Sequence, residues 1–183
     1  MIDISLDFLP TLQSGEVTPA QFIAAARAYK GLGYSAQGTF AAESLESGDV
    51  FGGKCDCVGL FLLAARRCGL LPRSFDPNLP PCLTGMSREN ALIEILTRNF
   101  GRVDVLAARP GDLLQIWMDG AREAKHIALL TSFEPSPYGS MIHACDDKTG
   151  NGRVWEMPVD GYTRGQIHRV YRLNRWIVGG AHG

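Results

Sequence analysis

Hydrophobic residues in the first half of the chain recur with the spacing of helices, and those in the second half alternate with the spacing of strands. Helices are predicted at 18–33, 57–69 and 87–101. The first has Thr18 as a candidate N-cap, and the second has Gly69 just after its last apolar turn. Apolar side chains cover most of the surface of the segment 57–69, so we expect this helix to be deeply buried.

The second half of the chain consists of short runs with a period near two, separated by turn residues. Strands are predicted at 112–118, 126–131, 138–144, 153–157 and 166–173. Helices followed by strands are typical of the α+β class, here with an antiparallel sheet packed against the buried helix. The length of 183 residues fits one domain that spans 1–183.

Composition and charge argue against nucleic-acid binding, membrane binding and secretion through a signal peptide. The formal net charge is −1, which offers no basic surface for nucleic acid or for an anionic membrane. The N-terminus has two early aspartates and no basic region, so no secretory signal peptide is predicted. No apolar run approaches the ~20 residues that cross a bilayer. We therefore expect synthesis in the cytoplasm and, if the protein acts outside, delivery by another component.

A proline-rich connection at 71–85 separates the second predicted helix from the third. Two interpretations stay open. The segment is either a surface loop or one wall of a substrate groove, because long loops in compact domains often carry function.

The five cysteines include a close pair, Cys55 and Cys57. An odd number of cysteines without a signal peptide favours reduced thiols over a disulfide framework. The sequence has no second close pair of ligands for zinc and no CxxC redox motif, so neither a metal nor a cofactor is predicted. Cys57 lies at the predicted start of a helix, where free N–H groups and the helix dipole stabilise a thiolate and lower its pKa. Cys57 is thus a candidate nucleophile, and the alternative is a small buried apolar residue.

A nucleophilic cysteine needs a base, and two histidines are suitably placed. His126 and His143 begin and end the segment 126–143. If they face each other across a hairpin, paired residue numbers add to 269 and the loop covers 132–137. Their Cβ atoms would then lie about 5 Å apart on one face. One imidazole could accept the proton of Cys57 while the other orients it. A shift of one residue would put them on opposite faces.

These residues occur within a series of short motifs that resemble the NlpC/P60 cysteine peptidases, in particular the cell-wall peptidases of phage tails and gene-transfer agents. The motifs follow one another in the order of that family over residues 18–173: "ARAYKGLGYSAQG" with Tyr34, "CDCVGLF" with Cys57, "RPGDLLQIW", "KHIALLTSFE" with His126, and "MIHA" with His143. The chain departs from the family pattern at Val58, where many members have serine, and at the additional Cys55.

The resemblance implies a papain-like α+β fold and hydrolysis of peptidoglycan stem peptides at a bond between D-γ-glutamyl and a diamino acid. Cys57 would attack the carbonyl and form a thioacyl-enzyme, His126 would be the general base, and His143 would orient His126. The backbone N–H of Cys57 and the hydroxyl of Tyr34 would stabilise the oxyanion. Asp56 would bind a substrate amine or pair with an arginine.

Two other functions use the same residues. The chain could be an amidase or acyltransferase on the same scaffold, because the geometry of a triad does not define the acyl group. It could also be a non-enzymatic module of a phage tail that retains the fold. The expected partners are a peptidoglycan peptide and proteins of a phage tail or gene-transfer agent, with no nucleic acid and no membrane. The resemblance implies a location on the virion or tail.

Overall fold

The computed structural model describes residues 17–35, 39–43, 50–71, 96–97, 100–118, 126–133, 136–146 and 151–173, with only the backbone at 39–43 and 50–51. The predicted connection at 71–85 and most of the predicted helix at 87–101 lie outside these ranges. The described part contains the helices α1 (Pro19–Arg27), α2 (Cys57–Arg67) and α4 (Gly161–Gly165) and the 3₁₀ turn η2 (Val105–Ala107). Its strands are β1 (Gly33–Tyr34), β2 (Thr39–Glu43), β3 (Val50–Cys55), β4 (Phe100–Val103), β5 (Leu113–Ile116), β6 (His126–Ser132), β7 (Ser140–Cys145), β8 (Arg153–Pro158) and β9 (Ile167–Leu173).

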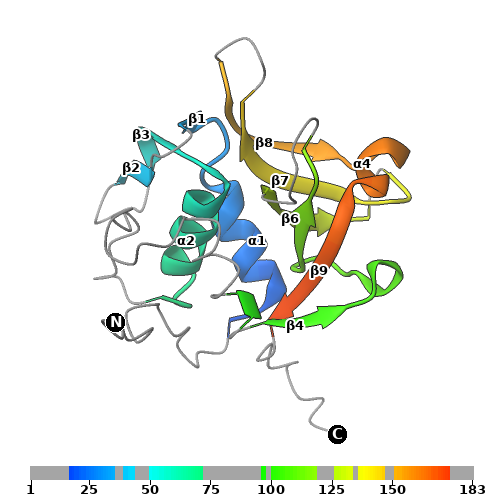
Figure 1. Ribbon diagram of the computed structural model, residues 1–183. Helices are drawn as coiled ribbons and strands as arrows, with labels where there is room; N and C mark the ends of the chain where they lie inside the picture. Colours follow the sequence, from blue (N-terminus) through cyan, green and yellow to red (C-terminus); the bar gives the residue numbers. More distant parts are fainter. Residues whose placement is uncertain are drawn as a thin grey trace, which may run out of the picture.

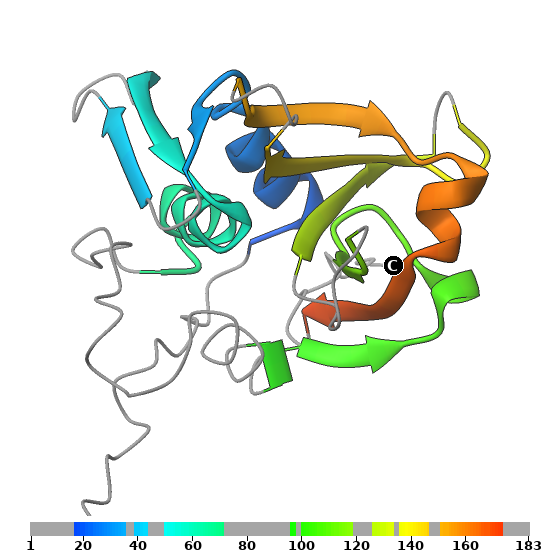
Figure 2. The same cartoon turned by 45° about the horizontal axis from the view of Figure 1, so that its top comes forward.

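The strands form one curled sheet in the order β2-β3-β1-β8-β7-β6-β5-β9-β4. All described pairs are antiparallel except that of β1 with β3. Helices α1 and α2 lie side by side along the concave side of the sheet, between β2 and β3 at one end and β6 to β9 at the other (Figures 1 and 2). The predicted α+β class is therefore confirmed. No helix in the described ranges is long and apolar enough to cross a membrane.

Local signals explain where the two long helices begin and end. Thr18 caps α1 through a capping box: its hydroxyl accepts from the Gln21 N–H at 3.2 Å, and the Gln21 side chain accepts from the Thr18 N–H at 2.7 Å. Asp56 caps α2 by accepting from the Gly59 N–H at 2.6 Å. Helix α2 ends at Arg67, and Gly69 follows its C-cap Cys68 with a φ of +84° that suits glycine. The starts predicted for both helices are confirmed.

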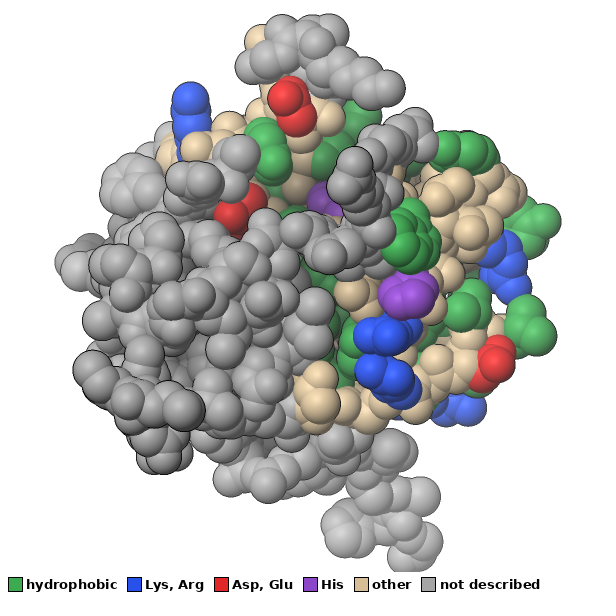
Figure 3. Space-filling view, in the orientation of Figure 1, with side chains coloured by type: hydrophobic (Ala, Val, Ile, Leu, Met, Phe, Trp, Pro, Cys, Tyr) green, Lys and Arg blue, Asp and Glu red, His purple; other side chains and the backbone are tan. Residues whose placement is uncertain are grey.

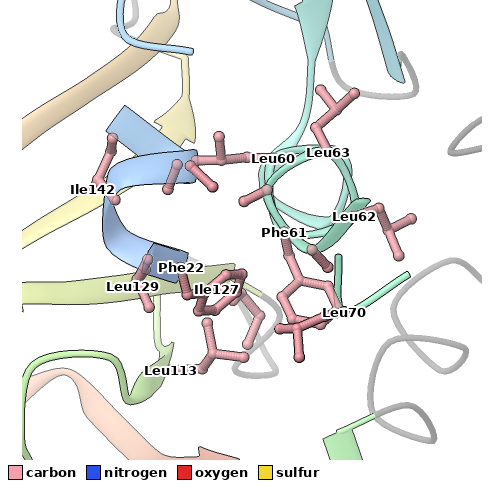
Figure 4. Close-up of a cluster of buried hydrophobic side chains, with 14 of the residues drawn as sticks. Phe22, Leu60, Phe61, Leu62, Leu63, Leu70, Leu113, Ile127, Leu129 and Ile142 are labelled. Carbon is pink, nitrogen blue, oxygen red and sulfur yellow. The ribbon is translucent and has the colours of Figure 1, made fainter. Parts of the chain in front are cut away.

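The core joins these helices to the sheet. Every residue of α2 from Val58 to Ala65 is buried, as its apolar surface predicts. Figure 4 shows side chains of α2 and Phe22 of α1 facing a group from the sheet, labelled Leu113, Ile127, Leu129 and Ile142. The opposite face of the same strands carries a second apolar cluster with Ala128, Leu130 and Met141. Alternation along β6 and β7 thus separates two sets of side chains.

Several parts of the described fold differ from the predictions. The helix predicted at 18–33 ends at Arg27, and Gly33–Tyr34 forms a strand instead. The strand Thr39–Glu43 was not predicted. Phe100–Val103 is a strand, where a helix was predicted to end at 101, because these residues pair with β9. β1 and β3 were not predicted, since β1 is very short and Gly52 and Gly53 disrupt the apolar alternation of β3. The connection before β9 contains α4, a short helix that Asp160 caps by accepting from the Thr163 N–H at 2.7 Å.

The "RPGD" motif ties the sheet to α1 and to β9. Gly111 has φ +97°, and a Cβ there would lie 2.6 Å from the Cβ of Pro19, so glycine allows the turn to touch the first turn of α1. Asp112 is 1% exposed and accepts from Nε and Nη2 of Arg172 at 2.9 and 2.7 Å. It also accepts from the Arg109 N–H at 2.7 Å. This carboxylate thus connects the turn before β5 to β9.

Replacing Asp112 by asparagine is expected to lower the free energy of unfolding by about 2–4 kcal/mol, because the amide cannot satisfy the two-pronged guanidinium of Arg172 and the backbone together. Urea denaturation measures the loss. Asp104→Asn is the matched control, since Asp104 is exposed and accepts a single bond, from the Leu106 N–H at 2.7 Å. That variant should lose about 1 kcal/mol or less. Equal losses in the two variants would contradict the role given to Asp112.

Candidate functional site

Cys57 is the first residue of α2 and is half-buried. The backbone N–H of Ile127, the second residue of β6, lies close enough to its sulfur to lower the pKa of the thiol. Cys57 and Ile127 also line one apolar cavity between α1, α2 and the sheet, together with Phe22. The thiol is thus held at the point where the start of α2 meets the start of β6.

The thiol of Cys57 is not the stabilised thiolate that its place at a helix start predicted. Burial, together with the neighbouring Asp56 carboxylate, raises the pKa of Cys57 to about 12. The N–H groups of Ile127, Val58 and Cys57 itself lower the pKa, but desolvation outweighs them. The prediction of a lowered pKa is therefore wrong. Cys57 carries its proton at neutral pH and needs a base to react.

His126 and His143 form a direct pair. Nε2 of His126 lies 2.7 Å from Nδ1 of His143, with ring centroids 5.0 Å apart and an angle of 76° between the rings. The two residues are 8% and 4% exposed. Burial lowers the pKa of His126 to about 3, with a further contribution from His143, and burial lowers the pKa of His143 to about 4. Both imidazoles are therefore neutral at pH 7, and one of them donates to the other.

The register that joins the two histidines differs from the predicted one. Leu129 pairs with Ile142 and Leu130 with Met141, so paired residue numbers add to 271 and not to 269. Next to the turn Ser132 pairs with Ser140, a sum of 272, and a bulge between Leu130 and Ser132 changes the sum to 271 along the strands. The predicted register is wrong by two residues. An even shift keeps both histidines on the same face of the sheet, where they meet diagonally.

Tyr34 lies at the end of β1 and is half-buried. Its N–H donates to the Gly152 carbonyl at 2.7 Å, which fixes the strand beside β8. Burial raises the pKa of Tyr34, and so do Cys57, Asp56, Asp146 and Cys145. The phenol therefore stays protonated and lies near groups from α2 and from the end of β7.

Asp56 directly precedes Cys57 and caps the helix that Cys57 begins. Its buried carboxylate caps α2 through the Gly59 N–H, which fixes the position of the adjacent Cys57. The signal in the sequence was an aspartate directly before an apolar helical run.

Two residues around the histidine pair were not predicted. Sγ of Cys145 lies 3.8 Å from Nε2 of His143. The ring of Trp155 stacks on His143 with centroids 6.0 Å apart and planes 9° apart. Both follow from pairing, since Cys145 is two residues after His143 on β7 and Trp155 is its partner on β8. The contact of Trp155 with His143 could have been predicted only from the register in which β8 pairs with β7.

The structure thus provides a protonated thiol at the start of α2, a pair of neutral imidazoles on β6 and β7, and a phenol near Cys57. Within the described part of the chain, no hydrogen bond joins Cys57 to His126. No group of three or more metal-ligating side chains occurs among the described residues.

The other two histidines were not predicted as site residues. His168 is exposed, and its ring makes an edge contact with that of Trp117, with centroids 5.4 Å apart. Figure 3 shows an exposed histidine side chain next to basic ones. His182 lies outside the described residues.

The fold is similar to that of solved NlpC/P60 proteins. NlpC1 from Trichomonas vaginalis matches over 90% of this chain and 47% of its own length, with a TM-score of 0.55 and 15% identity. A protein similar to lipoprotein, of the NLP/P60 family, from Staphylococcus aureus matches over 91% of this chain and 44% of its own, with a TM-score of 0.49 and 16% identity. The chain thus spans less than half of each. No family model and no curated protein sequence matches the chain. The likeness to NlpC1 shows a shared fold.

Proposed function

We propose that the chain is an NlpC/P60-type cysteine peptidase that hydrolyses peptidoglycan stem peptides at a bond between D-γ-glutamyl and a diamino acid. The observation that carries the proposal is the buried pair of neutral imidazoles, in which His126 Nε2 and His143 Nδ1 lie 2.7 Å apart. His126 directly precedes Ile127, whose backbone N–H acts on the Cys57 sulfur. The shared fold with NlpC1 supports it. The bond and the substrate come from the resemblance of the motifs.

His126 is the general base in this mechanism. Its Nε2 is occupied by His143, so Nδ1 is the ring nitrogen left to accept a proton. The thiol of Cys57 reaches Nδ1 when substrate is bound, since catalytic hydrogen bonds often tighten only then. Cys57 then attacks the carbonyl as its proton passes to His126. With a thiol pKa near 12, this transfer occurs together with the attack and not before it.

The remaining steps use the groups around Cys57. The tetrahedral oxyanion is stabilised by the Cys57 N–H at the start of α2 and by the protonated hydroxyl of Tyr34. The intermediate collapses to a thioacyl-enzyme as His126 gives its proton to the leaving amine. Water, deprotonated by His126, then attacks the thioester and releases the acid and the thiol. His143 holds the His126 ring in the orientation that each step needs.

The test is mass spectrometry of purified muropeptides incubated with the protein, with Cys57→Ala as the matched control. The proposal expects two fragments whose masses sum to the substrate plus one water, and no product with the control. Uncut peptides with the wild-type protein would overturn it. A fragment joined to an acceptor other than water would identify an acyltransferase on the same scaffold.

A further inference from the structure

The second ring nitrogen of His143 has a neighbour that the mechanism above does not use. Cys145 lies two residues after His143 on β7, so both side chains are on the same face of the strand. Its Sγ is 3.8 Å from His143 Nε2, a distance within reach of an N–H···S hydrogen bond, and the residue is 8% exposed. Cys145, His143 and His126 thus form a continuous series.

Protons can be arranged along this series in two ways. In the first, His126 Nε2–H donates to His143 Nδ1, and His143 Nε2–H donates to the Cys145 sulfur. His126 Nδ1 is then free to accept a proton. In the second, the Cys145 thiol donates to His143 Nε2, and His143 Nδ1–H donates to His126 Nε2. A neutral His126 then carries its proton on Nδ1 and cannot act as a base there.

Resting on the proposed function, we propose that Cys145 is a positioning residue whose sulfur accepts the Nε2–H of His143 and so selects the arrangement in which His126 Nδ1 is a base. The thiol is weak both as a donor and as an acceptor, but its polarisable sulfur gives a partner to an Nε2–H of His143 that would otherwise be buried without one, and this supports the first arrangement. Trp155, stacked on His143 with planes 9° apart, holds the ring and keeps Nε2 directed at the sulfur.

The test compares Cys145→Ala, Cys145→Ser and Cys68→Ala. The alanine variant leaves His143 Nε2 beside a methyl group, so its proton shifts toward Nδ1. We expect kcat on muropeptides to fall about threefold to tenfold with KM unchanged. Serine keeps an acceptor and should restore kcat to within about twofold. Cys68 also makes a weak hydrogen bond, from its Sγ to the Ala65 carbonyl at 3.5 Å, but lies at the other end of α2, so Cys68→Ala should keep full kcat.

The second readout is the tautomer itself, which a purely structural role would not move. In protein labelled with ¹⁵N-histidine, NMR at pH 7 should find His143 protonated at Nε2 in the wild type and in Cys145→Ser. A fraction protonated at Nδ1 should appear in Cys145→Ala. A wild-type His143 protonated at Nδ1, or an alanine variant with unchanged tautomer and kcat, would overturn the inference. If no muropeptide is cut, the proposed function fails, while the NMR result still decides whether Cys145 sets the tautomer.

Discussion

Replacing Cys57 by alanine is expected to reduce kcat/KM on muropeptides roughly 10⁴-fold or more, and replacing His126 in the same protein is expected to cost almost nothing further. Residues that act as one unit give strongly non-additive losses, because the base has no proton to accept once the nucleophile is gone. His126→Ala alone should come close to the loss of Cys57→Ala. The measurement is kcat/KM for the wild type, both single variants and the double variant.

This cycle is informative because the resting site has no hydrogen bond between these two side chains. Multiplicative losses in the double variant would mean that Cys57 and His126 act independently, and would contradict the mechanism. Leu106→Ala is a control for unspecific effects, since Leu106 is 84% exposed on η2. Far-ultraviolet circular dichroism should be the same for all variants, because neither residue supplies the cap or the apolar face of α2.

The buried histidine pair is expected to make the protein sensitive to mild acid. Both folded-state pKa values, about 3 for His126 and about 4 for His143, lie below the ordinary 6.5. As the pH falls below 6.5, the unfolded chain binds protons that the folded protein does not, so the free energy of unfolding decreases. From pH 7 to pH 5 the pair should cost on the order of 2–4 kcal/mol. Urea denaturation at several pH values measures this slope.

The matched variants separate the pair from other groups. His126→Gln/His143→Gln should flatten the dependence between pH 7 and pH 5, whatever its stability at pH 7. His168→Gln should leave the slope as it is, because His168 is exposed. Carboxylates titrate mostly below this window. A double variant with the slope of the wild type would show that the histidines become protonated in the folded protein near their ordinary pKa.

Features encoded by neighbouring residues could be predicted from the sequence. Thr18 and Asp56 precede apolar helical runs, and both cap the helices that follow. The strands of the second half also agree with their alternation, apart from their ends. β1 and β3 were not predicted, because a strand of two residues and a strand with two adjacent glycines show little alternation of apolar and polar residues.

The relative placement of the two candidate histidines could be predicted from the sequence, whereas the chemistry of the candidate residues could not. His126 and His143 were expected on one face, and they are, because only the parity of the register matters for that. The size of the shift in register depended on the bulge after Leu130, and the sequence around Leu130 has no recognisable signal for a bulge. The pKa of Cys57 was mispredicted because the helix start is a local feature, whereas desolvation comes from α1 and the sheet packed around the thiol.

The cap on α2 has a consequence for how such a protein can evolve. The carboxylate of Asp56, and not the thiol, holds the helix start, and the apolar residues after Cys57 supply its packing. Folding and reactivity therefore depend on adjacent but different residues. A descendant could exchange Cys57 for another small residue and keep the same structure. For the proposed peptidase, this offers a short path to a binding protein that recognises the same peptide without cutting it.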